Sequence, residues 1–487
     1  MAPTYVHASQ PITAALSRLE ALGCTEAAVA ARLGLEDLND LQLRALPIYR
    51  QERLEERDPL ALAIELFLLQ GALGPAEVAS LFPGGEQEAL VEAGLLAWKG
   101  GALRALASLY PVGRRLIFSD RAWPQMDQKA YSTVPYDQVM YVGTDSRWLA
   151  RATVRRPVAS ALDLCCGSGI HALLAADHAQ RVTAVDLNPR AVACTAFNAR
   201  AMGLEHLEAL QGDLYAPVAG RSFDLITCNP PFVPAPAQEV GFRDGGHSGE
   251  AIQRRLIEGL PRHLAPGGLC QIVTEFGERD GEPLEDRIRL WLGGAPMDLH
   301  ILRLRSSSAQ VYAIGHADGD DHAAFLASVG EWAANLRAQQ YTSISSVLLA
   351  FQWSEAPWTR VDEADPPRRE AGNELEGLFR AEALARDPAL PQRLASGRVA
   401  RAGPVALLGA RTLGTTLAAT TQARLAGMAL PVHHNLAPLE EDLLCCLDRP
   451  VATAELLAVG ERAGLNGEAV LDALVALVRK GFVLPQD

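Results

Sequence analysis

Lysine is scarce in this sequence, and both C-x-x-C pairs and long apolar runs are absent. Lysine occurs only at positions 99, 129 and 480, and the formal net charge of the 487 residues is −14. This acidic balance disfavours a large uniform surface for binding phosphates, although it is compatible with a local basic patch. None of the eight cysteines has C-x-x-C spacing, so a disulfide scaffold is not expected. No uncharged apolar stretch reaches the roughly 20 residues that span a bilayer, so no membrane partner is expected.

Other absences concern targeting and metal binding. No basic segment followed by an apolar run opens the sequence, so we expect a cytoplasmic protein without a secretory leader. In a reducing cytoplasm the cysteines, including the pairs Cys165-Cys166 and Cys445-Cys446, are expected to be small buried side chains. The pair His433-His434 has no carboxylate or thiol at ligand spacing, so no metal site is predicted.

The chain is long and apolar enough for several cores. Of its 487 residues 49% are hydrophobic, and the length suggests about three domains. Changes in the sequence pattern place them at residues 1–122, 123–318 and 319–487. The first and last regions are mostly helical, and the central one alternates between strands and helices.

The first region has the pattern of a winged helix. Leu60–Gln70, the segment starting at Gly74 and Glu86–Ala93 are expected helices, and Leu95–Trp98 with Ala102–Leu109 is an expected hairpin. A winged helix usually binds nucleic acid. The third helix carries three glutamates, the wrong charge for phosphate, so a role in dimerisation or in covering a substrate is favoured.

The last region ends in a second pattern of this kind. Leu439–Leu447, Thr453–Ala463 and Asn466–Lys480 are expected amphipathic helices, and a short apolar segment follows them. Asp362–Arg369 is expected to be a polar loop.

The central region predicts an α/β fold. Its alternation indicates a doubly wound, mainly parallel, seven-stranded Rossmann-like sheet with helices on both faces, flanked by the two winged-helix-like regions. The last strand follows its predecessor after a short turn and is expected to be antiparallel. The expected strands are Ala161–Leu164, Arg181–Asp186, Glu208–Gln211, Phe223–Cys228, Gly268–Glu275, Leu299–Arg305 and Gln310–His316. The helices between them include Pro189–Ala201 and Ala251–Leu264.

A glycine-rich turn after the first of these strands suits a nucleotide-like cofactor. Gly167 and Gly169 allow a sharp turn and a close approach to a ligand, and the free N–H groups of the following helix point at that ligand. Asp186 ends the next strand, where a carboxylate can accept hydrogen bonds from both ribose hydroxyls. Asp213, after the third strand, is placed to accept from an adenine amino group. The same glycine spacing fits a dinucleotide, so NAD is an alternative.

The segment Asn229-Pro230-Pro231-Phe232 suits a planar nitrogen, which is a poor nucleophile because its lone pair is delocalised. The Asn229 side-chain oxygen and the Pro230 carbonyl can each accept one N–H, which orients the lone pair and stabilises the positive charge that grows on nitrogen. The two prolines make the segment rigid, and Phe232 offers a face for stacking.

These motifs, in this order, resemble those of class I S-adenosylmethionine-dependent methyltransferases of the Asn-Pro-Pro-(Tyr/Phe) type, which include the glutamine N5 and ribosomal-RNA guanine-N2 methyltransferases. The loop Phe242–Gly249 resembles the Gly-Gly-x-x-Gly loop of these enzymes. The resemblance covers about residues 130–318 and implies S-adenosylmethionine as the cofactor. The flanking regions match neither the short helical domain nor the doubled domain of such enzymes.

The resemblance also implies a set of site residues. It places Asp163 at the acidic position of the first motif, and Gly143, Asp145 and Ser146 near the cofactor's amino and carboxylate groups. Asp145-Ser146 can equally cap the following helix. The residues expected to act on the acceptor are Asn229, Pro230, Pro231 and Phe232. Those expected at the cofactor are Gly143, Asp145, Ser146, Asp163, Cys165, Gly167, Gly169, Asp186, Leu187, Asn188, Gly212, Asp213, Leu214 and Asn229.

The leading hypothesis is methyl transfer to a planar amide or amine nitrogen. A small-molecule or peptide acceptor is favoured by the acidic charge, and RNA stays open through Arg114, Arg115 and Arg121. The flanking regions are expected to bind the acceptor, cover the site or form a homodimer. The alternatives are a ligand-sensing winged-helix protein that binds nucleic acid, other S-adenosylmethionine-using chemistry such as cyclisation, and an NAD-dependent reductase. The sequence shows no catalytic Tyr-x-x-x-Lys for the last of these.

Overall fold

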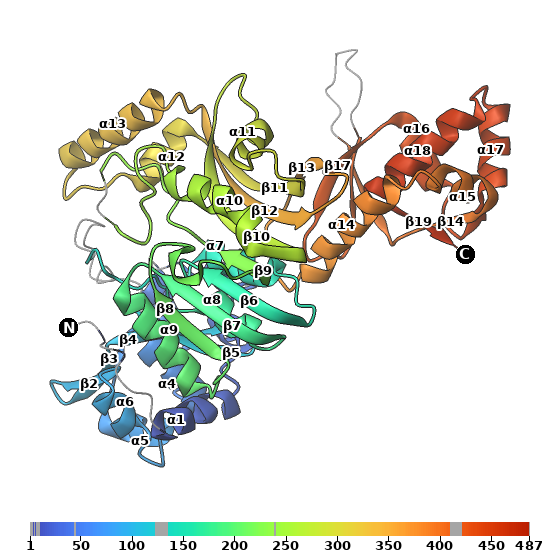
Figure 1. Ribbon diagram of the computed structural model, residues 1–487. Helices are drawn as coiled ribbons and strands as arrows, with labels where there is room; N and C mark the ends of the chain where they lie inside the picture. Colours follow the sequence, from blue (N-terminus) through green and yellow to red (C-terminus); the bar gives the residue numbers. More distant parts are fainter. Residues whose placement is uncertain are drawn as a thin grey trace. The chain divides into compact units, whose positions relative to one another are not determined.

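The computed structural model describes residues 3, 5, 10–42, 45–121, 135–237, 240–409 and 421–486. The chain divides into two compact units (Figure 1). The first unit comprises Met1–Ala150, Arg156–Ile301 and Arg305–Arg360. The second comprises Arg151–Arg155, Leu302–Leu304 and Val361–Asp487. The predicted boundary at residues 122–123 lies outside the described residues.

A mainly parallel sheet forms the centre of the first unit. Seven of its strands lie in the order β8 (Leu207–Gln211), β7 (Ala179–Asp186), β6 (Val158–Leu164), β9 (Phe223–Cys228), β10 (Leu264–Glu278), β12 (Ser343–Trp353) and β11 (Met297–Ser308). The neighbours from β8 to β10 are parallel, and β12 is antiparallel to β10. The direction of winding reverses between β6 and β9, and open α/β sheets bind ligands at the carboxyl ends of such strands. The glycine-rich turn follows β6, and Asn229 follows β9.

Helices connect these strands. They are α7 (Thr144–Ala152), α8 (Ile170–Ala175), α9 (Pro189–Ala201), α10 (Ala251–His263), α11 (Leu284–Trp291), α12 (Ala309–His316) and α13 (His322–Ala338). Figure 1 shows α9 beside β7 and β8, with which it is in contact. Asn188 caps α9 by accepting from the Arg190 N–H, and Pro189 fits the first helical turn because it lacks an N–H.

The prediction of a strand at Gln310–His316 was wrong, because these residues belong to α12. Ser308 begins the helix by accepting a hydrogen bond from the Val311 N–H at 3.3 Å. A short segment that mixes apolar and polar residues fits both the strand period of two and the helix period of about 3.6. The Ser308 cap stabilises the helix over the strand. The antiparallel strand is β12, so the sheet continues beyond residue 318.

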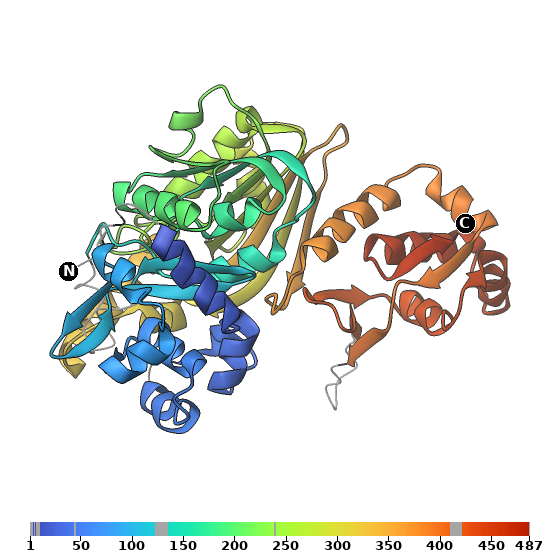
Figure 2. The same ribbon diagram turned by 90° about the horizontal axis from the view of Figure 1, so that it is seen from below.

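The N-terminal residues pack against the sheet's helices within the first unit. The helices are α1 (Gln10–Ala21), α2 (Glu26–Leu33), α3 (Leu46–Ile48), α4 (Pro59–Ala63), α5 (Pro75–Leu81) and α6 (Gln87–Glu92). The strands are β1 (Ala72–Leu73), β2 (Leu96–Lys99), β3 (Ala102–Ala105), β4 (Ala107–Val112) and β5 (Arg115–Asp120), so the expected strand Ala102–Leu109 is split in two. Strands β1, β3 and β2 form a small sheet, and β4 pairs with β5. One apolar core joins Leu66 and Phe118 to Phe197 of α9, and Figure 2 shows the N-terminal helices in blue.

The second unit has its own core. Its helices are α14 (Gly372–Ala385), α15 (Leu390–Ser396), α16 (Pro438–Cys445), α17 (Thr453–Arg462) and α18 (Gly467–Arg479). Strands β18 (Val451–Ala452), β14 (Arg398–Arg401) and β19 (Val483–Gln486) form one small sheet. A further set lies in the order β15 (Val405–Gly409), β16 (Thr421–Leu425), β17 (Val432–Leu436) and β13 (Thr359–Ala364), so the first part of the expected polar loop at 362–369 is strand. Leu394, Leu444, Leu474 and Phe482 are central to the apolar core.

The structure also bears on the cysteines and on membrane-spanning helices. Cys166, Cys194, Cys228 and Cys270 are buried as expected, but Cys445 and Cys446 are exposed because they end α16 at the surface. No helix in the described part of the chain is both long and apolar enough to cross a membrane.

Candidate functional site

The turn after β6 has the backbone conformation that a close ligand requires. Gly167 and Gly169 have φ values of 56° and 84°, which favour glycine. A Cβ on Gly169 would lie 2.8 Å from Cγ2 of Thr195, so this glycine also lets α9 pack against the turn. Cys165 has a φ of 56° although it is not glycine. Such conformations cost about 1–3 kcal/mol and cluster at functional sites.

Asp186 ties this turn to the end of β7. Its two carboxylate oxygens accept hydrogen bonds from the backbone N–H groups of Gly167 and Asn188, each at 2.8 Å. Burial raises the pKa of Asp186, and these hydrogen bonds oppose that effect. The carboxylate is therefore held in place with lone pairs still available for ligand hydroxyl groups.

Asp163 lies beneath the turn. Its oxygens accept from the Ala172 N–H at 3.0 Å and from the Thr227 hydroxyl at 3.1 Å, and its side chain is buried. Burial raises the pKa of Asp163 to about 7. Asp163 thus joins β6, the start of α8 and β9, and it does not line the cavity described next.

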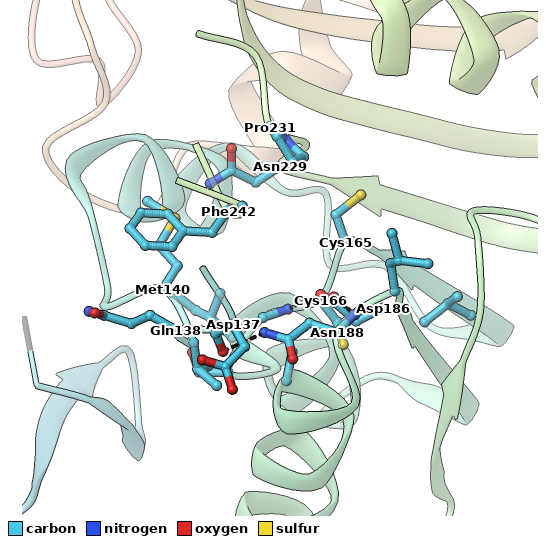
Figure 3. Close-up of a pocket in the computed structure, with 18 of the residues that line it drawn as sticks. Asp137, Gln138, Met140, Cys165, Cys166, Asp186, Asn188, Asn229, Pro231 and Phe242 are labelled. Carbon is cyan, nitrogen blue, oxygen red and sulfur yellow. Dashed lines mark hydrogen bonds between the residues drawn. The ribbon is translucent and has the colours of Figure 1, made fainter. Parts of the chain in front are cut away.

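A cavity of about 310 Å³ lies against the turn and is called the cofactor cavity. Its volume is at the lower end of the range of about 300–1,000 Å³ that is typical of cofactor sites. Figure 3 shows Asn229 and Pro231 at one end, Asp186 and Asn188 at the other, and Cys165 between them. The predicted residues that line it are Ser146, Cys165, Gly167, Asp186, Leu187, Asn188, Gly212, Asp213, Leu214, Asn229 and Pro231. Gly143, Asp145, Asp163, Gly169, Pro230 and Phe232 do not line it.

Asp213 lies at this cavity in an ion pair. Its Oδ2 is 2.7 Å from a guanidinium nitrogen of Arg255, and about half of each side chain is exposed. Leu214, the next residue, has a φ of 50°. Gly212 is required here because a Cβ would lie 2.2 Å from Cγ of Pro217.

The segment before α7 completes the cofactor cavity, and sequence reasoning assigned it only in part. Asp137, Gln138 and Met140 line the cavity, as does Phe242 from the glycine-rich loop. Phe242 contacts Tyr141 edge-on, with ring centroids 6.5 Å apart. The one sequence signal for these residues is their position next to Gly143 and within the loop Phe242–Gly249.

The side chain of Asn229 is held in one orientation. Its Nδ2 donates to Oδ2 of Asp145 at 2.9 Å and to Oγ of Ser146 at 3.0 Å. Both N–H bonds are thereby used, so the side-chain oxygen is the group left for an incoming N–H donor. A Cβ on Gly143 would lie 2.5 Å from Oδ1 of Asp145, so glycine makes room for this carboxylate. Burial raises the pKa of Asp145, and the hydrogen bond from Asn229 opposes that effect.

The glycine-rich loop packs directly on the backbone of the Asn-Pro-Pro-Phe segment. A Cβ on Gly249 would lie 2.3 Å from the carbonyl oxygen of Phe232, and a Cβ on Gly245 would lie 2.9 Å from that of Pro231. Gly249 also has a φ of 74°. The glycines of this loop therefore let it approach the Asn-Pro-Pro-Phe segment closely, and this contact fixes the position of the segment.

A second cavity, of about 680 Å³, lies on the Phe232 side and is called the acceptor cavity. It shares Met140, Tyr141 and Val142 with the cofactor cavity, so the two adjoin. Residues distant in sequence line it, including Gly143, Asp145, Trp148, Phe232, Glu275, Arg305, Tyr312 and Ser346. Sequence reasoning missed Trp148, Glu275, Arg305 and Tyr312. Glu275 and Arg305 each carried one signal, as the last residues of expected strands.

Two known families match parts of the chain. The family described as "Methyltransferase small domain" matches residues 142–286. A family described as "Domain of unknown function (DUF7059)" matches residues 21–106. The first match contains the glycine-rich turn, Asp186, Asp213 and the Asn-Pro-Pro-Phe segment.

Curated relatives agree with this match. The ribosomal protein uL3 glutamine methyltransferase of Bradyrhizobium diazoefficiens is 34% identical over 174 residues, 33% of this chain and 51% of that protein. The release factor glutamine methyltransferase of Moorella thermoacetica is 35% identical over 140 residues, 26% of this chain and 49% of that protein. The ribosomal RNA small subunit methyltransferase C of Alcanivorax borkumensis is 32% identical over 113 residues, 23% of this chain and 31% of that protein. The chain spans about half the length of the first two.

The fold and these matches define a class I S-adenosylmethionine-dependent methyltransferase domain. It is of the type found in glutamine and ribosomal-RNA methyltransferases, as the motifs predicted. The cofactor of this domain is S-adenosylmethionine, and the alternative of NAD is set aside.

Proposed function

We propose that this protein transfers a methyl group from S-adenosylmethionine to a planar amide nitrogen of a protein acceptor. Gly167, Cys165 and Asp186 would hold the cofactor in the cofactor cavity, where glycine leaves the space that a Cβ would fill. When bound, S-adenosylmethionine supplies a methyl group activated by its attachment to sulfur. The observation that carries the proposal is the orientation of Asn229, whose amide N–H groups are bound by Asp145 and Ser146.

The role of Asn229 follows from this orientation. Its side-chain oxygen accepts one N–H of the acceptor, and the backbone carbonyl of Pro230 accepts the other. The nitrogen lone pair is then held in one direction, and the two oxygens stabilise the positive charge that develops on nitrogen. Phe232, which lines the acceptor cavity, provides a face for the planar group. No base is needed first, because the N–H becomes acidic only as the new bond forms.

A glutamine amide in a protein is the acceptor that the relatives favour. Several of them are named as glutamine methyltransferases of a ribosomal protein or a release factor. Two of the three arginines considered for RNA are engaged within the chain, since Arg115 contacts Asp177 at 2.5 Å and Arg121 contacts Gln70 at 2.8 Å, while Arg114 is exposed. These contacts reduce the support for an RNA acceptor.

The flanking regions are assigned supporting roles in this proposal. Helices α5 and α6 with β1, β2 and β3 have the element order of a winged helix, and α16, α17 and α18 occur with the small sheet of β18, β14 and β19. Glu88 and Glu92 are exposed on α6, which disfavours phosphate contact. We therefore assign these two groups of elements to acceptor binding or homodimer formation rather than to DNA recognition.

The test is methyl transfer from radiolabelled S-adenosylmethionine to a panel of glutamine-containing peptides and matched peptides with glutamate in place of glutamine. Mass spectrometry locates the added methyl. Asn229→Ala is expected to lower kcat by about 100- to 1,000-fold with little change in cofactor affinity. Asn435→Ala, an exposed position in the second unit, is the control. Wild-type turnover in Asn229→Ala, or equal labelling of the two peptide sets, would contradict the proposal.

A further inference from the structure

The acceptor cavity contains a fixed carboxylate that methyl transfer to a simple amide does not use. Glu275 lies near the end of β10 and lines this cavity. The Tyr312 hydroxyl donates to its Oε2 at 2.7 Å, and the Ser346 hydroxyl donates to its Oε1 at 3.0 Å. Tyr312 belongs to α12 and Ser346 to β12, so three elements fix the position of one carboxylate. Groups held in this way are pre-organised to bind a ligand.

The two groups that donate hydrogen bonds to the Glu275 carboxylate are both hydroxyls. Arg147 and Arg305 also line the cavity, but Arg147 pairs with Glu26 at 3.0 Å, and the Arg305 guanidinium lies over the Trp148 ring, 5.0 Å from its centroid. Among the described residues, Glu275 forms no ion pair with either of them. Asp145, also at this cavity, adds a second negative charge. Burial raises the pKa of Glu275, and the charge of Asp145 raises it further. A positively charged or N–H-rich group would therefore stabilise the cavity.

The sheet register relates Glu275 to the methyl-transfer position. Cys228 of β9 pairs with Ile272 of β10, so Asn229 comes level with Val273. Glu275 lies two residues further along β10, which corresponds to about 7 Å at the usual rise of a strand. One acceptor molecule can therefore contact Asn229 with its reacting nitrogen and Glu275 with a second group.

We propose that Glu275 is an acceptor-binding residue that recognises a second, planar N–H-bearing group of the amidinium or guanidinium class. This inference rests on the proposed function and specifies its acceptor. A carboxylate binds two adjacent N–H donors side by side, and the ring of Phe232 lines the same cavity as a flat surface for such a group. A peptide with glutamine alone would offer Glu275 no charged partner beyond the hydroxyls of Tyr312 and Ser346, so the acceptor presents an arginine-like group beside the methylated amide.

Benzamidine is a suitable probe because it carries a planar amidinium on an aromatic ring. Neutral benzamide is its matched control. Both would be titrated calorimetrically into the full chain saturated with S-adenosylhomocysteine. Wild-type protein is expected to bind benzamidine at least about tenfold more tightly than benzamide, and Glu275→Gln is expected to remove that preference. Glu258→Gln changes an exposed glutamate on α10 and should behave as wild type.

The outcomes separate this inference from the proposed function. Binding of S-adenosylhomocysteine by every variant shows that the variants are folded, and its absence in wild type would count against the proposed function instead. Tyr312→Phe removes one hydroxyl and keeps the ring, so it should weaken benzamidine binding less than Glu275→Gln does. Equal affinity of wild type and Glu275→Gln for benzamidine, equal affinity of wild type for the two probes, or no benzamidine binding would each overturn the inference.

Discussion

The cofactor cavity and the acceptor cavity adjoin each other but are built in different ways. The cofactor cavity is lined mainly by short motifs at strand ends, namely residues 165–168, 185–189 and 212–214, together with 136–142. The acceptor cavity collects side chains from segments between Leu38 and Ser346. Residues at the carboxyl ends of parallel strands meet wherever the sheet forms, whereas the second set depends on how loops and helices pack on it. One cavity follows from local sequence, and the other depends on tertiary packing.

The largest expected effect is on stability and concerns Asp163, which links β6 to β9 and to the start of α8. Its folded pKa of about 7 is raised above the unfolded value of about 4. The native state therefore holds the proton more tightly, and the free energy of unfolding should fall as pH rises between about 4 and 7. The loss is expected to reach about 4 kcal/mol. Urea unfolding curves measured at several pH values should show that Asp163→Asn removes this pH dependence of the unfolding free energy. If the variant kept the same pH dependence as wild type, Asp163 would not be its source.

A change at Asp186 should affect the cofactor cavity alone. Asp186→Ala removes a carboxylate that accepts from Gly167 and is held ready for ligand hydroxyls. Affinity for S-adenosylmethionine should fall by about 10- to 100-fold in calorimetric titration. Glu208→Gln, on the exposed edge strand β8, is the matched control. If Asp186→Ala bound the cofactor as tightly as wild type, the assignment of this cavity would fail.

Alanine substitutions at two glycines of the same loop can test the acceptor side separately from the cofactor side. Gly249 and Gly246 have φ values of 74° and 83°, but only Gly249 has a neighbour within 4 Å of an added Cβ. Gly249→Ala should therefore cost about 1–2 kcal/mol more in unfolding free energy than Gly246→Ala. It should also lower methyl transfer while cofactor binding is retained. Equal effects of the two substitutions would show that the contact with Phe232 is unimportant.

The smallest effect is expected from a substitution of Asp145, which was predicted at the cofactor and lines the acceptor cavity. Asp145→Asn should allow the Asn229 amide to turn, because it loses the carboxylate that accepts from Nδ2. We expect a decrease in kcat of about tenfold, equivalent to one hydrogen bond to a charged group, with cofactor affinity unchanged. A loss of cofactor affinity with kcat retained would restore the original prediction.

Much of the central fold was predictable because its signals are local. The strand Phe223–Cys228 and the helix Pro189–Ala201 were predicted with the bounds that the structure shows. The helix begins with Asn188 and Pro189, and the strand is a buried apolar run, so neighbours in sequence suffice. Gln310–His316 was predicted incorrectly because its short pattern fits a strand or a helix, and the true antiparallel strand comes more than 25 residues later.

By itself, the sequence determined the glycine-rich turn, the acidic residues at strand ends and the Asn-Pro-Pro-Phe segment, because each acts through backbone conformation or chemistry within a few residues. Tertiary structure alone decided that Asp145 and Ser146 hold Asn229, since 83 or 84 positions separate them along the chain. It also decided that Tyr312 and Ser346 hold Glu275. Contacts of this kind depend on which strands become neighbours and on how α12 packs, and no local pattern encodes either.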